Sequence, residues 1–142
     1  MVRRPFFIQT SGGQEHSPIY MRIATLARTR PAIKSVFSGP VGLYEMRVGC
    51  DGSMPEALYP DLDVQIWDLY HSGNPEKARE IFSKRVLMQY TTQLIPGARA
   101  YIMKKRGVFK NAFSRREKTD FTPDAIREMD FEFEGLRPYL RG

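Results

Sequence analysis

The side chains of this sequence that could do chemistry are few and lie far apart. A metal site needs three or four histidine, cysteine or carboxylate ligands at short spacing, whereas the chain has two histidines and one cysteine. His16 and His71 lie in separate polar segments, which favours surface or capping roles over metal binding or proton transfer. Cys50 cannot form a disulfide within the chain, and its place beside a glycine is typical of a small buried residue. We therefore expect neither a metal site nor a cofactor.

Three carboxylates are further candidates. Asp61 and Asp63 lie near the start of an expected helix, where the helix dipole favours acidic side chains, so we interpret them as first-turn residues rather than a catalytic pair. Glu56 follows Met54-Pro55 and could face the mouth of a pocket. It could equally be a carboxylate at the start of a helix, and both interpretations stay open.

Small residues close three apolar segments in the first 60 residues. These are Ser11-Gly12-Gly13, Gly39-Pro40 and Gly52-Ser53-Met54-Pro55. Glycine lets a backbone approach a ligand closely, although it serves tight turns equally well. We place the functional rim of the protein at Gly39 and at Gly52-Ser53-Met54-Pro55.

The segments that hold this rim alternate between strand and helix patterns. We predict strands at 5–10 and 33–39 and an extended segment at 50–55, with helices at 17–30 and 42–49 between them. Such alternation predicts parallel βαβ units, in which ligands bind at the C-terminal ends of the strands.

From residue 61 onward the pattern is helical. We predict helices beginning at Asp61, as a capping residue, and at Glu76, Ala98 and Thr122. Gly107 is expected to end the third. The second helix should bury one apolar face, made of Ala78, Ile81, Phe82, Val86 and Tyr90.

Aromatic residues at helical spacing, Trp67 among them, are most simply core residues. Phe121, Phe131 and Phe133 have a second interpretation, as cover for a subunit contact, because the last helix otherwise carries many charges.

The composition of the chain argues against several classes of protein. Apolar residues make up 42% and charged residues 27%, and no apolar run approaches the ~20 residues that span a bilayer. The N-terminal apolar run is too short for a signal peptide, so a cytoplasmic location is expected. The net charge of +6 is spread among acidic residues without an aromatic–basic RNA motif, which favours a solvated surface over nucleic-acid binding. A basic module that binds nucleic acid stays open as an alternative function.

Three motifs follow one another along the chain: Val36-Phe37-Ser38-Gly39, Gly49-Cys50-Asp51-Gly52-Ser53-Met54-Pro55 and Tyr70-His71-Ser72-Gly73-Asn74-Pro75-Glu76-Lys77-Ala78. Together they resemble the seventh strand, the eighth strand and the following helical hairpin of the dihydrodipicolinate synthase and N-acetylneuraminate lyase family of class I aldolases. Lys104 or Lys105, followed by Gly107, fits a helix end further along that family's chain.

The resemblance implies a barrel in which a lysine at the end of the sixth strand forms a Schiff base with a 2-keto acid, while a fifth-strand tyrosine transfers protons. Gly39 and Met54 match substrate-binding positions of the seventh and eighth strands. Phe7-Ile8-Gln9-Thr10 matches the sixth strand, so the Schiff-base position falls on Gln9, whose amide nitrogen is not nucleophilic. Lys34 lies early in its strand, near the wrong end of a barrel. No catalytic residue is therefore carried over.

The expected fold class is α/β: a partial (β/α)8 TIM barrel, formed by its last three strands, followed by a C-terminal helical region. Residues 1–60 would hold the strands and helices of the barrel, and residues 61–142 its last helix and the helical tail. A whole barrel typically needs ~250 residues, so we expect a fragment or a chain that pairs with another.

By resemblance, the function is that of a lyase or aldolase acting on pyruvate or a keto sugar acid as a homo-oligomer, here truncated and inactive alone. The alternative is a non-catalytic oligomer partner that docks on another barrel subunit.

Overall fold

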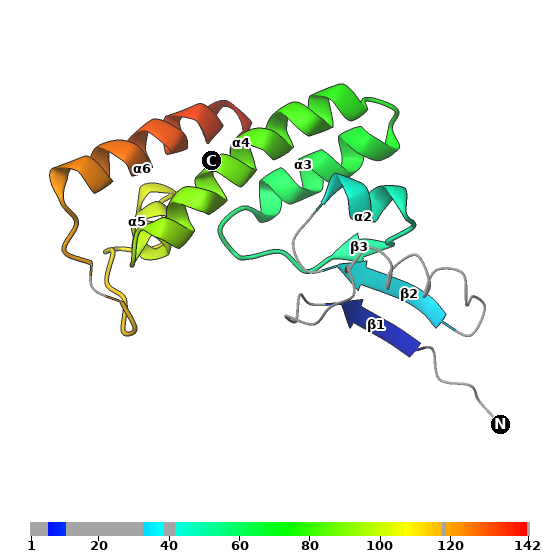
Figure 1. Cartoon of the computed structure of the whole chain (residues 1–142), viewed down its shortest axis with the longest axis horizontal. Helices are drawn as coiled ribbons and strands as arrows, with labels where there is room; N and C mark the ends of the chain where they lie inside the picture. The colour runs from blue at the N-terminus through cyan, green and yellow to red at the C-terminus, as the bar shows by residue number, and fades with distance from the viewer. Residues whose placement is uncertain (1–5, 11–32, 39–41, 118, 142) are drawn as a thin grey trace. The chain divides into compact units, whose positions relative to one another are not determined.

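The structure is a computed structural model, and it describes residues 6–10, 33–38, 42–117 and 119–141 (Figure 1). The chain divides into two compact units, Met1–Glu56 and Ala57–Gly142. The predicted helix at 17–30, His16, and Gly39 with Pro40 lie outside the described residues.

The first unit holds a parallel sheet in the order β1-β2-β3, formed by β1 (Phe6–Thr10), β2 (Ile33–Ser38) and β3 (Gly52–Ser53). The short helix α2 (Leu43–Arg47) connects β2 to β3. Val36, Met46 and Cys50 are buried, as expected where apolar residues of a strand and its crossover helix share a core. The predicted parallel alternation is confirmed for these elements, although β3 is shorter than the predicted segment. Three parallel strands are consistent with part of a barrel.

The second unit is helical and begins with two antiparallel helices, α3 (Pro60–His71) and α4 (Pro75–Leu94). Gly73 turns the chain between them with a φ of +86°, a conformation that glycine adopts without strain. Asn74 caps α4 by accepting a hydrogen bond from the backbone N–H of Lys77. The prediction that Asp61 caps α3 is wrong, because Tyr59 is the capping residue and Pro60 takes the first helical position.

The buried face of α4 differs from the predicted one. Val86 and Tyr90 are 41% and 60% exposed, so their assignment to the buried face is wrong. The face that packs inward consists of Ala78, Ile81, Arg85, Met88, Thr91 and Thr92. Arg85 lies in the middle of this face, so the face does not show an uninterrupted apolar periodicity in the sequence.

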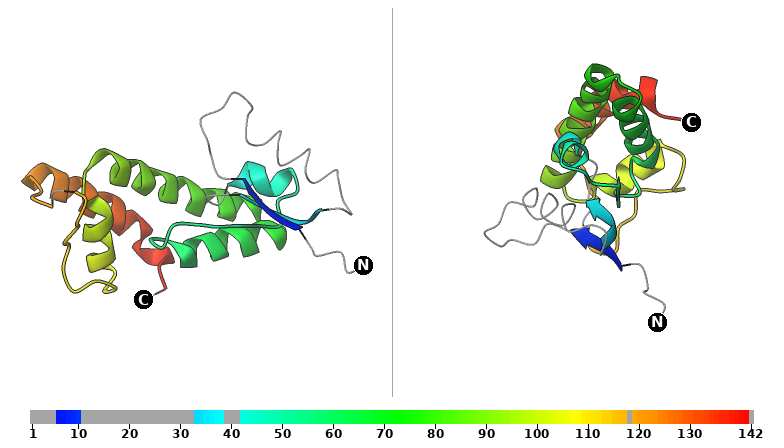
Figure 2. Two further views of the ribbon diagram at one scale, coloured as in Figure 1. Left: turned by 90° about the horizontal axis from the view of Figure 1, so that it is seen from below. Right: turned by 90° about the vertical axis from the view of Figure 1, so that its right-hand side faces the viewer.

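Two further helices complete the second unit. α5 (Ala98–Lys105) ends just before Gly107, whose φ is +75°, as predicted. α6 (Pro123–Leu136) begins at Thr122, whose Oγ1 accepts a hydrogen bond from the N–H of Ala125 at 3.2 Å. α6 packs against α4 (Figure 2), and the short helix η1 (Arg137–Tyr139) follows it. Among the described residues, no helix is both long enough and apolar enough to cross a membrane.

Candidate functional site

The candidate site is the C-terminal edge of the parallel sheet in the first unit. Thr10, at the end of β1, is the register partner of Ser38, and Ser38 is the partner of Ser53 in β3. One step earlier, Gln9 pairs with Phe37, which pairs with Gly52. Because parallel α/β folds bind ligands at the carboxyl ends of their strands, this edge is where a small molecule would bind.

Gly52 has a packing role at this edge. A Cβ placed on Gly52 would lie 2.7 Å from Cε1 of Phe37, closer than side chains pack. The absence of a side chain at Gly52 therefore makes room for an aromatic ring from the neighbouring strand. From the sequence, this glycine could serve either the close approach of a ligand or a tight turn. The structure shows a different role, which is to leave space for the Phe37 ring.

Hydrogen bonds from the segment before β3 fasten it to β2. The carboxylate Oδ2 of Asp51 accepts a hydrogen bond from the N–H of Val36 at 2.9 Å, and the N–H of Asp51 donates to the carbonyl of Val36 at 2.8 Å. The Sγ of Cys50 lies 3.1 Å from the same carbonyl and 2.8 Å from that of Gly52. Cys50 is 5% exposed, which agrees with its interpretation as a small buried residue.

Met54 comes directly after β3 and is 54% exposed. Its N–H donates to the carbonyl of Ser38 at 3.0 Å, so its backbone is held at the end of β2 while its side chain remains accessible. Gly39, the other predicted substrate-binding residue, lies outside the described residues. Glu56 is half-buried and precedes the first residue of α3, Pro60, by four positions, so it is not in that helix's first turn.

The two residues considered for the Schiff base lie in different parts of the sheet. Gln9 is the fourth of the five residues of β1, close to the edge that carries Ser38. Lys34 lies near the opposite end of β2. There Phe6 and Phe7 of β1 pair with Ile33 and Ser35, so Lys34 has no register partner in β1. The expectation that Lys34 lies near the wrong end of the strands is confirmed.

His71 has the capping role that the sequence favoured. It is exposed at the end of α3, its Nδ1 lies 2.9 Å from the carbonyl of Trp67, and the two rings are 4.4 Å apart. Within the described part of the chain, no group of three or more histidine, cysteine, aspartate or glutamate residues could hold a metal ion.

A buried ion pair in the second unit was missed by the sequence analysis. Asp63 lies in the first turn of α3, as predicted, but its Oδ1 is 2.6 Å from Nε of Arg85, and the two side chains are 2% and 1% exposed. Arg85 also donates to Gln89 at 2.8 Å. The only sequence signal is that Arg85 continues the spacing of Ala78 and Ile81. The pair joins α3 to α4 and has a structural role.

A second polar cluster joins α5 to α6. The hydroxyl of Tyr101 and the ammonium of Lys105 both donate to Oδ1 of Asp130, each at 2.8 Å. Burial, followed by the hydrogen bond to Asp130, raises the pKa of Tyr101 to about 12. Burial opposes ionisation of Asp130, but the bonds from Lys105 and Tyr101 outweigh it and lower the pKa of Asp130. Perturbed pKa values often mark active sites, yet here they accompany helix packing.

Comparison with known proteins supports the resemblance. No protein-family model and no curated protein matches the sequence. A solved dihydrodipicolinate synthase from Rhodopseudomonas palustris matches with 27% sequence identity and a TM-score of 0.67, over 82% of this chain and 42% of that one. The 4-hydroxy-tetrahydrodipicolinate synthase from the thermoacidophilic methanotroph Methylacidiphilum fumariolicum SolV matches with 19% identity and a TM-score of 0.70, over 94% and 45%. The second likeness shows the fold alone.

The chain spans less than half the length of either synthase that it matches. That share is consistent with a correspondence to one half of such a protein. The chain is thus structurally similar to dihydrodipicolinate synthases, and this similarity supports the family that its motifs indicated.

Proposed function

We propose that this chain is the C-terminal half of a dihydrodipicolinate synthase-like lyase or aldolase acting on a 2-keto acid, such as pyruvate or a keto sugar acid. The observation that supports this most is the match to the Rhodopseudomonas palustris synthase, at 27% identity over 82% of the chain. In this proposal the ends of β1, β2 and β3 correspond to the sixth, seventh and eighth strand ends of the family's barrel.

In the proposed site, Gly39 and Met54 line the keto acid pocket. Two observations support this role for Met54. Its side chain is exposed, and the backbone hydrogen bond to Ser38 keeps this apolar group at the ends of two adjacent strands. Pyruvate carries a methyl group on its keto carbon, and an apolar wall suits that part of the molecule.

The family's reaction needs an amine that this chain lacks at the matching position. A lysine amine adds to the keto carbon and water leaves, and the protonated imine then withdraws electrons so that an adjacent bond breaks. The lone pair of an amide is delocalised, so Gln9 cannot form this imine. Lys34 precedes Ser38 by four residues, which is about 13 Å along a strand. We propose that the chain by itself forms no Schiff base.

Ligand binding at the strand ends tests the proposed substrate class. We expect pyruvate to perturb the backbone NMR signals of Ser38, Ser53 and Met54 more than lactate, which has no keto group. Met54→Ala should weaken the pyruvate effect, while Val64→Ala, at an exposed residue of α3, should leave it unchanged. Signals at the three strand-end residues that ignore pyruvate would contradict the proposal.

A second candidate function is that of a non-catalytic partner docking on another barrel subunit. It is favoured by the presence of Gln9 where the family has its Schiff-base lysine. It is also favoured by the edges of the sheet, since β1 and β3 each have one neighbouring strand within the described residues. An unpaired strand edge presents free backbone groups that a further strand could pair with. Co-purification with a complete barrel subunit would support it, whereas a chain that unfolds cooperatively as a stable monomer would contradict it.

A further inference from the structure

The excess positive charge of this chain is concentrated in one segment. Lysine and arginine outnumber aspartate and glutamate by 22 to 16, which gives the net charge of +6. Residues 104–116 contain six lysine and arginine residues and no acidic residue, so the rest of the chain holds 16 residues of each sign. The whole excess therefore lies at the end of α5 and in the loop that follows it. We call residues 104–116 the basic segment.

Two of these six cations already have partners in the second unit. The ammonium of Lys105 lies 2.8 Å from a carboxylate oxygen of Asp130, and the guanidinium of Arg106 lies 2.8 Å from one of Asp61. The other four are exposed and have no ion pair among the described residues, and they are Lys104, Lys110, Arg115 and Arg116. These four are available to an anion outside the molecule.

Three large apolar side chains lie between these exposed cations. Val108 is 59% exposed, Phe109 45% and Phe113 67%. They fall within six residues of one another, and clustered exposed apolar side chains mark interaction sites. Figures 1 and 2 show the basic segment, in yellow, as an irregular loop at the outside of the helices of the second unit.

Local hydrogen bonds hold the backbone of the basic segment. The N–H groups of Val108 and Phe109 donate to the carbonyl of Met103 at 3.0 and 3.2 Å. Further along, the side-chain oxygen of Asn111 accepts a hydrogen bond from the N–H of Phe113 at 3.2 Å. The apolar side chains are therefore presented from a constrained backbone, which lowers the entropy cost of binding.

We propose that the basic segment binds the surface of an anionic lipid bilayer. Val108, Phe109 and Phe113 enter the boundary between the headgroups and the acyl chains, while the exposed cations contact the lipid phosphates. Each lysine or arginine near an anionic bilayer strengthens binding about fivefold, and buried apolar side chains add to the affinity. This contact is peripheral, and it does not rest on the proposed keto acid chemistry.

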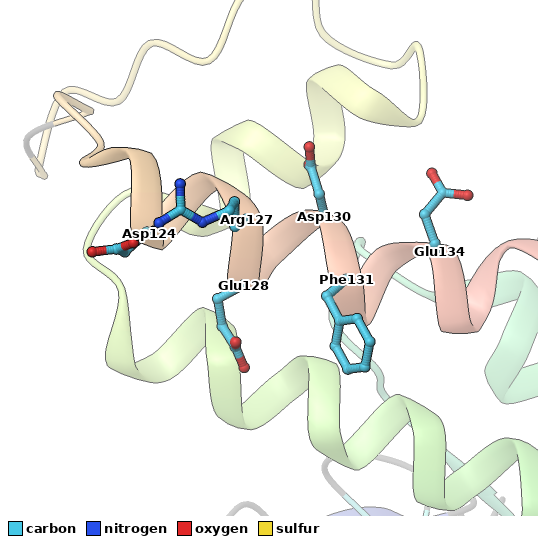
Figure 3. Close-up of a pocket in the computed structure, with 6 residues that line it drawn as sticks. All are labelled: Asp124, Arg127, Glu128, Asp130, Phe131 and Glu134. Carbon is cyan, nitrogen blue, oxygen red and sulfur yellow. Dashed lines mark hydrogen bonds and ion pairs between the residues drawn. The ribbon is translucent and has the colours of Figure 1, made fainter.

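The acidic helix α6 determines which side of the second unit meets the lipid. It carries five acidic residues and one arginine, and Figure 3 shows Glu128 projecting from one flank and Glu134 from the other. Phe131, one of the phenylalanines considered for a subunit contact, is 74% exposed on α6, whereas Phe133 is buried. An anionic surface repels the carboxylates around Phe131, so the basic segment, and not α6, turns toward the bilayer.

The exposed side chains favour lipid over nucleic acid as the occupant. Bases can stack on the rings of Phe109 and Phe113, but the aliphatic side chain of Val108 gives a base nothing to stack on. Hydrocarbon accepts aliphatic and aromatic side chains alike. A single strand also needs a groove that follows its backbone, whereas these side chains lie on one loop at the outside of the helices (Figure 2).

Flotation of the full chain with lipid vesicles tests the inference. We expect the chain to float with vesicles of equal parts phosphatidylglycerol and phosphatidylcholine, and to stay behind with vesicles of phosphatidylcholine alone. Binding to the anionic vesicles should weaken as salt rises, because the cations are exposed. On these vesicles the added indole of Phe113→Trp should shift its fluorescence to the blue, whereas that of Tyr90→Trp, at an exposed residue of α4, should not.

Two double variants separate the apolar contribution from the charged one. Phe109→Ser with Phe113→Ser should weaken vesicle binding at least about tenfold. Arg115→Gln with Arg116→Gln should weaken it roughly 25-fold. The matched control carries Arg79→Gln and Arg137→Gln, at exposed residues of α4 and η1, and lowers the net charge by the same amount. This control should bind as the native chain does.

The contrary results are distinct from one another. A chain that does not float with the anionic vesicles would overturn the inference, and so would flotation that is equally strong on both kinds of vesicle. Flotation that is unchanged by the paired phenylalanine substitutions would also overturn it, because the apolar side chains would then stay outside the lipid. A labelled single-stranded oligonucleotide tests the other occupant at the same salt concentration. Tight binding to it by a chain that does not float would assign the basic segment to nucleic acid instead.

Discussion

The ring of Phe37 lies against Gly52 on the neighbouring strand, so that a Cβ on Gly52 would approach its Cε1 to 2.7 Å. The two residues are register partners in β2 and β3, one step before the strand ends that carry Ser38 and Ser53. This contact supports the edge at which we propose keto acid binding. The packing of β2 against β3 at this edge therefore requires a residue without a side chain at position 52.

Gly52→Ala should destabilise the chain by about 1–3 kcal/mol, because the added methyl group forces the Phe37 ring to move. Phe37→Leu in the same chain should recover part of this loss, since a smaller side chain vacates the space. Urea unfolding of the single and double variants measures both effects. If Gly52→Ala is as stable as the native chain, the close packing is not as described.

The buried pair of Asp63 and Arg85 should show strong coupling. Asp63→Leu or Arg85→Met alone leaves a charge buried without its counterpart, which costs about 3–5 kcal/mol. Asp63→Leu combined with Arg85→Met removes both charges and should cost much less than the sum. Denaturant unfolding in a double-mutant cycle measures the coupling. Glu134→Gln, in an exposed pair, is the control and should cost at most about 1 kcal/mol. Additive losses at the buried pair would refute this account.

Tyr101 should ionise at higher pH than an ordinary tyrosine. Its pKa of about 12 exceeds the usual value of about 10, because the hydroxyl is partly buried and donates a hydrogen bond to the Asp130 carboxylate. An alkaline titration followed by tyrosinate absorbance should show this late step, and Tyr101→Phe should remove it. Asp130→Asn should move it toward the usual value, leaving burial as the remaining cause.

Stability should follow the same titration. Because the folded pKa is raised, the neutral hydroxyl contributes its full stability below about pH 10, and this is lost as pH rises through about 12. Tyr101→Phe should therefore lose less stability than the native chain across that interval. Tyrosines that all titrate together near pH 10 would show that the cluster does not form in solution.

Local signals predicted much of the fold. The alternation of apolar runs with glycine predicted the parallel strands, and Gly107 and Thr122 marked the end of α5 and the start of α6 correctly. These features depend on nearby residues, so a pattern along the chain can show them.

Features that depend on distant partners could not be predicted in this way. Arg85 is buried because Asp63 reaches it from another helix, and its burial turns Val86 and Tyr90 outward. Gly52 is required by Phe37, fifteen positions away, rather than by a turn or a ligand. The roles of Gly39 and Met54 stay predictions, since Gly39 lies outside the described residues.

The most direct test of the central claim is borohydride reduction of the chain in the presence of pyruvate, read by mass spectrometry of the intact protein and of its peptides. We predict no reduced adduct on the native chain, since Gln9 occupies the matching position and Lys34 lies at the far end of β2. Gln9→Lys should form an adduct at the introduced amine, and Lys34→Gln in that background should leave it unchanged. A pyruvate adduct on the native chain would contradict the account.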